Sequence, residues 1–291
     1  NGDCVVAANM DNCAVSFPLI TRRYILIKMM NTGGAWTDIR QGIAGFRLWQ
    51  SLARQDIRLK YRRSTLGPFW ITLSMAVTVS AMGPLYGALF STDLAEFVPH
   101  LALGLIFWAF IAGSISEYAE TFTANEHILK QSYLPLSALV MRVFYRQLLI
   151  LLHNLLIYPF VMLFLGLGIN SNIFWLLPAF VLVSVNILWL GLIIAIFCTR
   201  FRDMMPVIQS IVTLLFFVTP IIWRLNQLPE GRLHIAQMNP FTSLITLLRD
   251  PVLGIMPAPL YWQVAAAFAL GGTALAMWVF SLTRKKITYW L

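Results

Sequence analysis

Charged residues are scarce in this sequence. Asp, Glu, Lys and Arg make up 11% of its 291 residues, whereas hydrophobic residues make up 59%. Soluble domains contain about 25% charged residues. This shortage excludes an ordinary soluble protein and leaves little chain for a separate soluble domain. The net charge is +9. Because the basic residues flank apolar runs, membrane lipids explain them better than a nucleic acid partner does.

Residues that could carry chemistry are also few. No CxxC pair or Cys/His cluster occurs among Cys4, Cys13, Cys198, His100, His127, His153 and His234. We therefore expect neither a disulfide framework nor a metal site, and no cofactor. The sequence also lacks a GxxxxGK[ST] phosphate-binding loop. It thus offers no catalytic residue, and we do not expect an enzyme.

No charged residue stands in the middle of a long apolar run. Ion-coupled transporters usually need an intramembrane Asp, Glu or His, and His153 alone is a thin basis for a proton relay. A membrane transferase would need carboxylates or an acidic, metal-binding cluster near the interface. Glu117 and Glu120 could share a helix face there, but we interpret them as solvated residues that close a span. Uphill transport by this chain would therefore need energy from a partner.

What the sequence has in abundance is long apolar runs. A helix of about 20 apolar residues crosses the ~30 Å hydrocarbon core of a bilayer. Six runs approach that length: 69–90, 98–116, 147–168, 173–198, 207–223 and 262–282. If the chain crosses the membrane at each run, Lys and Arg are concentrated in the segments that lie on the cytoplasmic side. The sequence thus predicts an all-α, multi-pass membrane protein with six transmembrane helices and both termini in the cytoplasm.

The stretch between the last two runs is unusual. Residues 224–261 contain five prolines around an amphipathic piece at 241–248, and they carry the only basic residues expected on the outer side. Two interpretations fit equally well. The stretch is either a pair of re-entrant half-helices shielded by protein, or a plain external loop.

A basic segment precedes the first apolar run. On a helical period, one face collects Arg47, Ser51, Arg54, Arg58 and Arg62, and another collects Phe46, Trp49, Ala53, Ile57 and Tyr61. Residues 46–63 are therefore expected to form an amphipathic interfacial helix, with aromatics among acyl chains and arginines near lipid phosphates. The alternative is a solvated basic tail. Residues 1–40 resemble nothing that follows, and we expect a disordered extension there, with residues 1–29 lying upstream of a plausible native opening at Met30.

Aromatic residues are frequent, and most fit interfacial belts or packing. Some could instead line a path and stack on sugar faces. The candidates near span ends are Trp70, Phe107, Trp108, Tyr118 and Trp223.

Five motifs occur in a fixed order along residues 43–291. They are KYRRSTLGPFWITLS at 60–74, LPLSALVMRV at 134–143, TRFRDMMPVI at 199–208, FFVTPIIW at 216–223 and NPFT at 239–242. Together they resemble the ABC-2 type permeases, the membrane subunits of ABC exporters. The GPFW form of the first motif is most similar to the branch that exports O-antigen and other lipid-linked polysaccharides. Residues 41–291 are therefore assigned to one permease domain.

The resemblance implies a homodimeric pore in the bacterial inner membrane, bound to two ATPase subunits and carrying a lipid-linked polysaccharide such as O-antigen outward. It also implies that the interfacial helix and the loop 125–135 dock in the ATPase clefts. The residues assigned to this coupling are Arg54, Arg58, Asn125, Ile128, Leu129, Lys130, Gln131 and Tyr133. From its residues alone, the loop could be an ordinary polar linker. Alternative functions are export of a drug or lipid by the same machinery, or a membrane enzyme or flippase acting on lipid-linked sugars without ATP.

Overall fold

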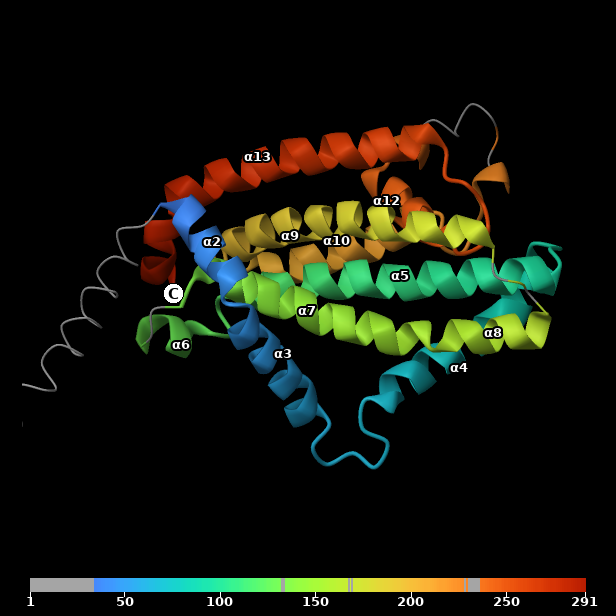
Figure 1. The fold of residues 1–291 in the computed structure, drawn as a ribbon, viewed down its shortest axis with the longest axis horizontal. Helices are drawn as coiled ribbons and strands as arrows, with labels where there is room; N and C mark the ends of the chain where they lie inside the picture. Colours follow the sequence, from blue (N-terminus) through green and yellow to red (C-terminus); the bar gives the residue numbers. More distant parts are fainter. Residues whose placement is uncertain (1–33, 132–133, 167, 169, 228, 230–235) are drawn as a thin grey trace, which may run out of the picture.

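The computed structural model describes residues 34–131, 134–166, 168, 170–227, 229 and 236–291, and the elements found in them are helices (Figure 1). Five helical segments are long and apolar enough to cross a membrane. They are α4 (Phe69–Leu89), α5 (Leu94–Glu120), α7 with α8 (Leu136–Leu155 and Ile157–Leu165), η1 with α9 (Ser171–Trp175 and Leu176–Arg200) and α13 (Pro259–Trp290). The expected all-α membrane fold is confirmed.

The expected span at 207–223 corresponds to a shorter helix, α10 (Met204–Val218), of 15 residues. At 1.5 Å per residue it is about 22 Å long, less than the hydrocarbon thickness. The helix ends before residue 223 because Thr219 precedes Pro220 and is extended, with φ −88° and ψ 138°. The ring of a proline disfavours helical geometry in the residue before it.

The third expected span begins earlier than its apolar run suggested. Helix α7 starts at Leu136 rather than near residue 147. It is followed at Leu156 by α8, whose third residue is Pro159. A proline removes one backbone donor and clashes with the carbonyl four residues back, here that of Leu155, which accounts for the break. Gly166 ends α8 in the left-handed region, at φ 65°.

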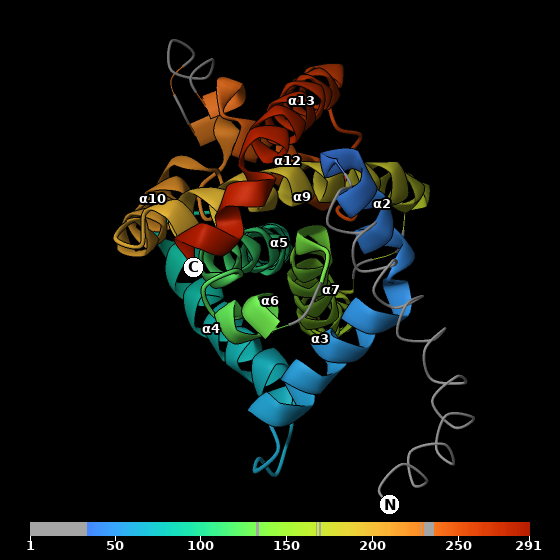
Figure 2. The same ribbon diagram turned by 90° about the vertical axis from the view of Figure 1, so that its left-hand side faces the viewer.

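Helix α5 occupies the middle of the bundle, with α4, α7, α9 and α10 around it and α13 packed against α9 (Figures 1 and 2). Within its apolar window 78% of the residues are buried, more than in any other of the five segments. One end of the bundle carries α2 (Ala35–Ala44), α6 (Glu126–Gln131) and the end of α13, while α12 (Pro240–Arg249) lies toward the other end (Figure 1).

The amphipathic helix expected at 46–63 is present as α3, and a further helix, α2, lies before it. Helix α3 (Phe46–Lys60) starts where expected and stops three residues short of Arg63, and α2 precedes it across Gly45. The expected domain boundary near residue 40 thus falls inside α2, while residues 1–33 lie outside the described residues. Part of the apolar face of α3 turns toward protein, because Ala53 is fully buried and Trp49 packs edge-on against Tyr145 of α7.

The proline-rich stretch contains a buried helix. Asn239 caps α12 by accepting a hydrogen bond from the Phe241 amide, and Pro240 occupies its first turn. Both are favoured at those positions. Residues Thr242–Arg249 are all buried against α5, α9 and α13. A plain external loop therefore does not describe this part, while residues 228 and 230–235 lie outside the described residues.

Candidate functional site

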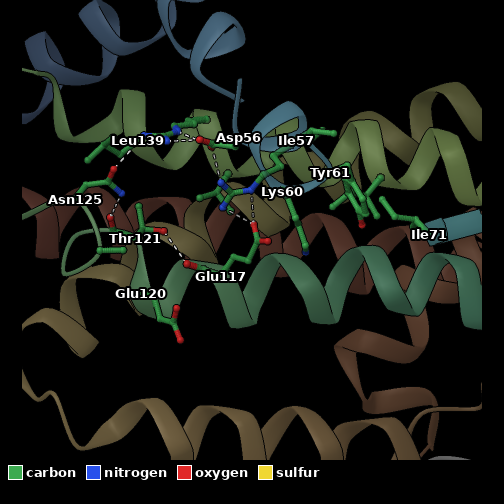
Figure 3. Close-up of a pocket in the computed structure, with 15 residues that line it drawn as sticks. Asp56, Ile57, Lys60, Tyr61, Ile71, Glu117, Glu120, Thr121, Asn125 and Leu139 are labelled. Atoms are coloured by element: carbon green, nitrogen blue, oxygen red, sulfur yellow. Dashed lines mark hydrogen bonds and ion pairs between the residues drawn. The ribbon is translucent and has the colours of Figure 1, made fainter. Parts of the chain in front are cut away.

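An ion-pair cluster joins three helices near the α6 end of the bundle (Figure 3). Asp56 of α3 receives a two-pronged contact from Arg142 of α7, with Nε–Oδ2 2.8 Å and Nη2–Oδ1 2.5 Å. Arg146 lies one turn further along α7 and donates to the same carboxylate at 2.6 Å. Its other nitrogens reach Glu117 of α5 at 2.9 and 2.7 Å. The two arginines share one face because residues four apart in a helix are neighbours.

The cluster extends to the start of α6 through Asn125. The Asn125 Oδ1 accepts from Arg142 Nη1 at 3.0 Å, and its Nδ2 donates to the Thr121 carbonyl at 2.8 Å. Because an amide with both ends bonded has one orientation, Asn125 fixes the point at which the chain leaves α5 and enters α6. The sequence analysis assigned Asn125 to partner contact, and in the structure its side chain bonds within its own chain.

A cavity of about 370 Å³ lies beside the cluster, between α3, α5 and α7 (Figure 3). Its lining combines the charged groups above with Lys60, Tyr61 and Glu120. Aliphatic side chains such as Ile57, Leu139 and Ile150 complete the wall. Mixed lining of this kind keeps the arginine–carboxylate pairs partly shielded, with side-chain exposures of 14% for Arg142 and 18% for Asp56.

Helix α6 projects from this base and has no buried residue. Lys130 pairs with Glu126 at 2.6 Å, and this hydrogen bond lowers the pKa of the Glu126 carboxyl. Ile128 is 40% exposed, whereas Leu129 is half-buried against the core of its own chain. Gln131 is exposed, and Tyr133 lies outside the described residues. Ile128 is thus the outward-facing apolar side chain of this helix.

The two arginines assigned to coupling on α3 differ in their surroundings. Arg54 is held by its own chain, because its guanidinium lies 6.0 Å from the Tyr145 ring centre and donates to the Tyr145 hydroxyl at 3.3 Å. Arg58 lies one turn further along the same helix, and both arginines are exposed.

The cluster residues Asp56, Glu117, Arg142 and Arg146 were not among the predicted site residues. A signal was present in the sequence. Two arginines four residues apart at the start of an apolar helix require carboxylate partners, since an unpaired charge there is costly. Asp56 is the one acidic residue in the basic stretch 54–63. What the sequence could not supply was the neighbourhood of α3 and α7, which are about 90 residues apart at the Asp56–Arg146 contact.

The five aromatic path candidates are not brought together. Phe107, Trp108 and Tyr118 are buried in the core of α5. Trp108 contacts the rings of Phe216 and Phe241. By contrast, Trp70 is 46% exposed at the start of α4.

Trp223 is half-buried and donates to the Phe217 carbonyl at 3.1 Å. None of the five path candidates lines the cavity at the ion-pair cluster or the apolar cavity of about 760 Å³ between α4 and α8. Among the described residues, no group of three or more His, Cys, Asp or Glu side chains is placed to hold a metal ion.

The fold and the cluster define an integral membrane protein with amphipathic helices and a small projecting helix gathered at one end of its bundle. A family model described as "ABC-2 type transporter" matches residues 47–253, and the chain belongs to this family. It is therefore the non-catalytic transmembrane permease subunit of an ABC transporter, a multi-pass membrane protein that pairs with an ATPase subunit.

Similar proteins include two O-antigen export system permease proteins named RfbA. The protein from Klebsiella pneumoniae is 24% identical over 214 residues, which cover 70% of this chain and 80% of that protein. The protein from Myxococcus xanthus is 25% identical over 202 residues, covering 67% of this chain and 76% of that protein.

Proposed function

We propose that this chain is the permease of an exporter that carries a lipid-linked polysaccharide, an O-antigen-like glycan, from the cytoplasmic to the outer side of the bacterial inner membrane. The observation that carries the proposal is the similarity to O-antigen export permeases over 70% of this chain and 80% of the relative. In this proposal a homodimer forms the pore, and two ATPase subunits bind on the cytoplasmic side.

The proposal counts α10 as the sixth crossing, completed by the non-helical residues that follow Val218. It places α2 and α3 at the cytoplasmic interface, where α3 leaves Arg58 exposed and Phe46 49% exposed. It treats α12 as a re-entrant half-helix in the outer leaflet. Support for this comes from its burial on protein, since backbone that does not cross the bilayer is tolerated at membrane depth where protein covers it.

The coupling element in this proposal is α6, with Ile128 as the apolar anchor that enters a cleft of the ATPase. Support comes from its exposure on a helix otherwise composed of polar residues and the inward-turned Leu129. Burying such a side chain contributes roughly 1.5–3 kcal/mol. Lys130 and Gln131 would bond at the rim, and the cluster at Asn125 would hold the base of the helix firm.

For the substrate path, the proposal keeps Trp70 and Trp223, whose side chains retain accessible surface. Phe107, Trp108 and Tyr118 would reach a glycan only if helices separated around α5, because they are packed in the core of one protomer.

The substrate is tested in a strain that lacks this chain. We expect surface polysaccharide to disappear and the lipid-linked glycan to accumulate on the cytoplasmic side, with both restored by the native chain. The measurements are surface labelling of the glycan and mass analysis of the extracted lipid-linked species. A normal glycan surface together with reduced export of a drug or phospholipid would reject the proposal.

The docking helix is tested by Ile128→Asp. We expect this variant to insert and fold as the native chain does, because position 128 is exposed, yet to lose ATPase copurification and export. The neighbouring change His127→Asp is the matched control, since it introduces the same charge at an exposed position without removing the anchor. Full ATPase binding by Ile128→Asp would show that α6 is not the docking element.

A further inference from the structure

Asp38 of α2 is a buried carboxylate, 1% exposed, at a junction of three helices. Its oxygens accept hydrogen bonds from the first two amides of α7, those of Leu136 at 3.3 Å and Ser137 at 3.1 Å. The Ser137 hydroxyl lies 2.8 Å from Asp38 Oδ1. Arg284 of α13 donates to Asp38 Oδ2 at 2.9 Å.

This carboxylate acts as the cap of α7. The residue at the usual capping position is Pro135, which provides no side-chain bond. The first amides of a helix lack internal partners and attract negative charge, so a carboxylate there is stabilising. Charge-assisted bonds of this type are roughly twice as strong as neutral ones.

The contact between α2 and α7 is also close enough to fix their relative position. A Cβ atom at Gly42 would meet the Ser137 Oγ at 2.1 Å, so the backbone of α2 lies directly against the start of α7. Only a glycine permits this approach.

The position of this junction gives it a mechanical consequence. Helix α6 ends at Gln131 and α7 begins at Leu136, so residues 132–135 alone separate the projecting helix from the capped end. Asn125, the residue immediately before α6, is held by Arg142 of α7. The first residues of α7, after α6, bond to Asp38 of α2, which also pairs with Arg284 of α13. The described residues on either side of α6 are therefore bonded to other helices.

We propose that Asp38 is a positioning residue for energy coupling: it ties the start of α7, the helix that follows α6, to α2 and α13, so that a push on α6 by the ATPase moves the cytoplasmic end of α13. The proposal rests on the proposed docking role of α6. Asp38 and Arg284 both lie outside residues 47–253, the part matched by the family model. The junction therefore connects the two ends of the chain through residues that the family model does not cover.

The first readout of the test follows the motion directly and needs no glycan. Spin labels are placed at Tyr289→Cys on α13 and Phe164→Cys on α8, positions 89% and 85% exposed, and the chain is assembled with its ATPase. We expect ATP to change the distance between the labels in the native background. Asp38→Asn should keep the ATPase bound but abolish that change, because the neutral amide loses the ion pair and at least one of the bonds to α7.

The matched control is Asp93→Asn, which alters the exposed capping carboxylate of α5 at a separate position. It should leave the ATP-dependent distance change intact. ATP-driven export should fall at least about fivefold per ATP hydrolysed in Asp38→Asn, the low end of typical coupling free energies, and stay native in Asp93→Asn. A purely structural role would lower the melting temperature without changing this ratio.

A second variant provides an independent test in case Asp38→Asn folds poorly. Arg284→Gln removes the α13 side of the junction and leaves the α7 cap in place, so it should lose the α13 movement while α7 stays capped. A native distance change in either well-folded variant, or no ATP-dependent change in the native chain, would overturn the proposal. Failure of the docking role itself is recognised separately, by full ATPase binding in Ile128→Asp.

Discussion

Arg142 holds Asp56 in a way that lysine cannot reproduce. Its Nε and Nη2 engage the two carboxylate oxygens at 2.8 and 2.5 Å while Nη1 bonds Asn125. A lysine donates all its hydrogen bonds from a single nitrogen and cannot reproduce the spacing of these three contacts, which come from three separate nitrogens of a planar group. We therefore expect Arg142→Lys to lower stability by about 1–3 kcal/mol, the usual penalty for leaving partly buried polar groups without partners. The measurement is thermal unfolding of the purified protein in detergent.

The control for this residue is Arg62→Lys, at an exposed position in the turn after α3. Its effect should be close to zero, because exposed arginines contribute little to stability. Equal melting temperatures for Arg142→Lys and the native chain would mean that the cluster does not stabilise the contact between α3 and α7.

At the scale of elements, the packing of α13 on α9 depends on one glycine of an adjacent pair. A Cβ at Gly272 would meet the Trp189 ring at 2.0 Å. The ring cannot easily move, because its Nε1 donates to Asn186 at 3.1 Å and Phe268 packs edge-on at 4.8 Å. By contrast, nothing lies within 4 Å of a Cβ at Gly271.

This pair gives a prediction with its own control. Gly272→Ala should destabilise the protein by roughly 1–3 kcal/mol, as overpacking typically does. Gly271→Ala should be neutral or stabilising by up to about 1 kcal/mol, the helix propensity gained over glycine. Resistance to unfolding in increasing fractions of a denaturing detergent would measure both. Equal stability of the two variants would contradict the α9–α13 contact described here.

The elements that the sequence predicted well are those governed by hydrophobic length. The runs at 69–90 and 173–198 correspond closely to α4 and α9, because burial in lipid requires a continuous apolar helix. The start of α7 was missed because Arg142 and Arg146 interrupt the apolar pattern, and only their pairing with Asp56 and Glu117 makes them compatible with a helix in the bundle. Helix boundaries set by such distant partners do not follow from local pattern.

The candidate site was predictable in part for a similar reason. Helix α6 lies within the loop 125–135 that the sequence analysis assigned to coupling, but only Ile128 of its two apolar residues is exposed, while Leu129 is half-buried. Which of the two neighbours turns inward is set by packing on the bundle and not by local sequence. The capping of α7 by Asp38 could not be predicted, because it joins residues 98 and 99 positions apart. Its pairing with Arg284 spans a still larger separation of 246 positions.

At the scale of the whole molecule, the arginines on the α12 side bear on the proposed orientation, in which this side faces outward. The outer side of a membrane protein is expected to be poor in basic residues. Arg224 pairs with Glu96 and also donates to the Glu96 carbonyl at 2.8 Å. Arg249 pairs with Asp250 at 3.4 Å and donates to the Pro220 carbonyl at 2.7 Å. Both side chains are thus largely buried and locally neutralised, at 13% and 5% exposure.

This balance of charge predicts the orientation of the chain, and the prediction is open to a direct test. At the α6 end, Arg58, Lys130 and Lys285 are exposed. We therefore expect this end, with α2 and the end of α13, to face the cytoplasm. In a variant without the three native cysteines, Asp93→Cys and Ile255→Cys should react with an impermeant thiol reagent added to intact cells, while Arg202→Cys and Lys285→Cys should react only after lysis. Labelling of positions 202 and 285 from outside would invert the molecule and place α6 where no cytoplasmic ATPase could reach it.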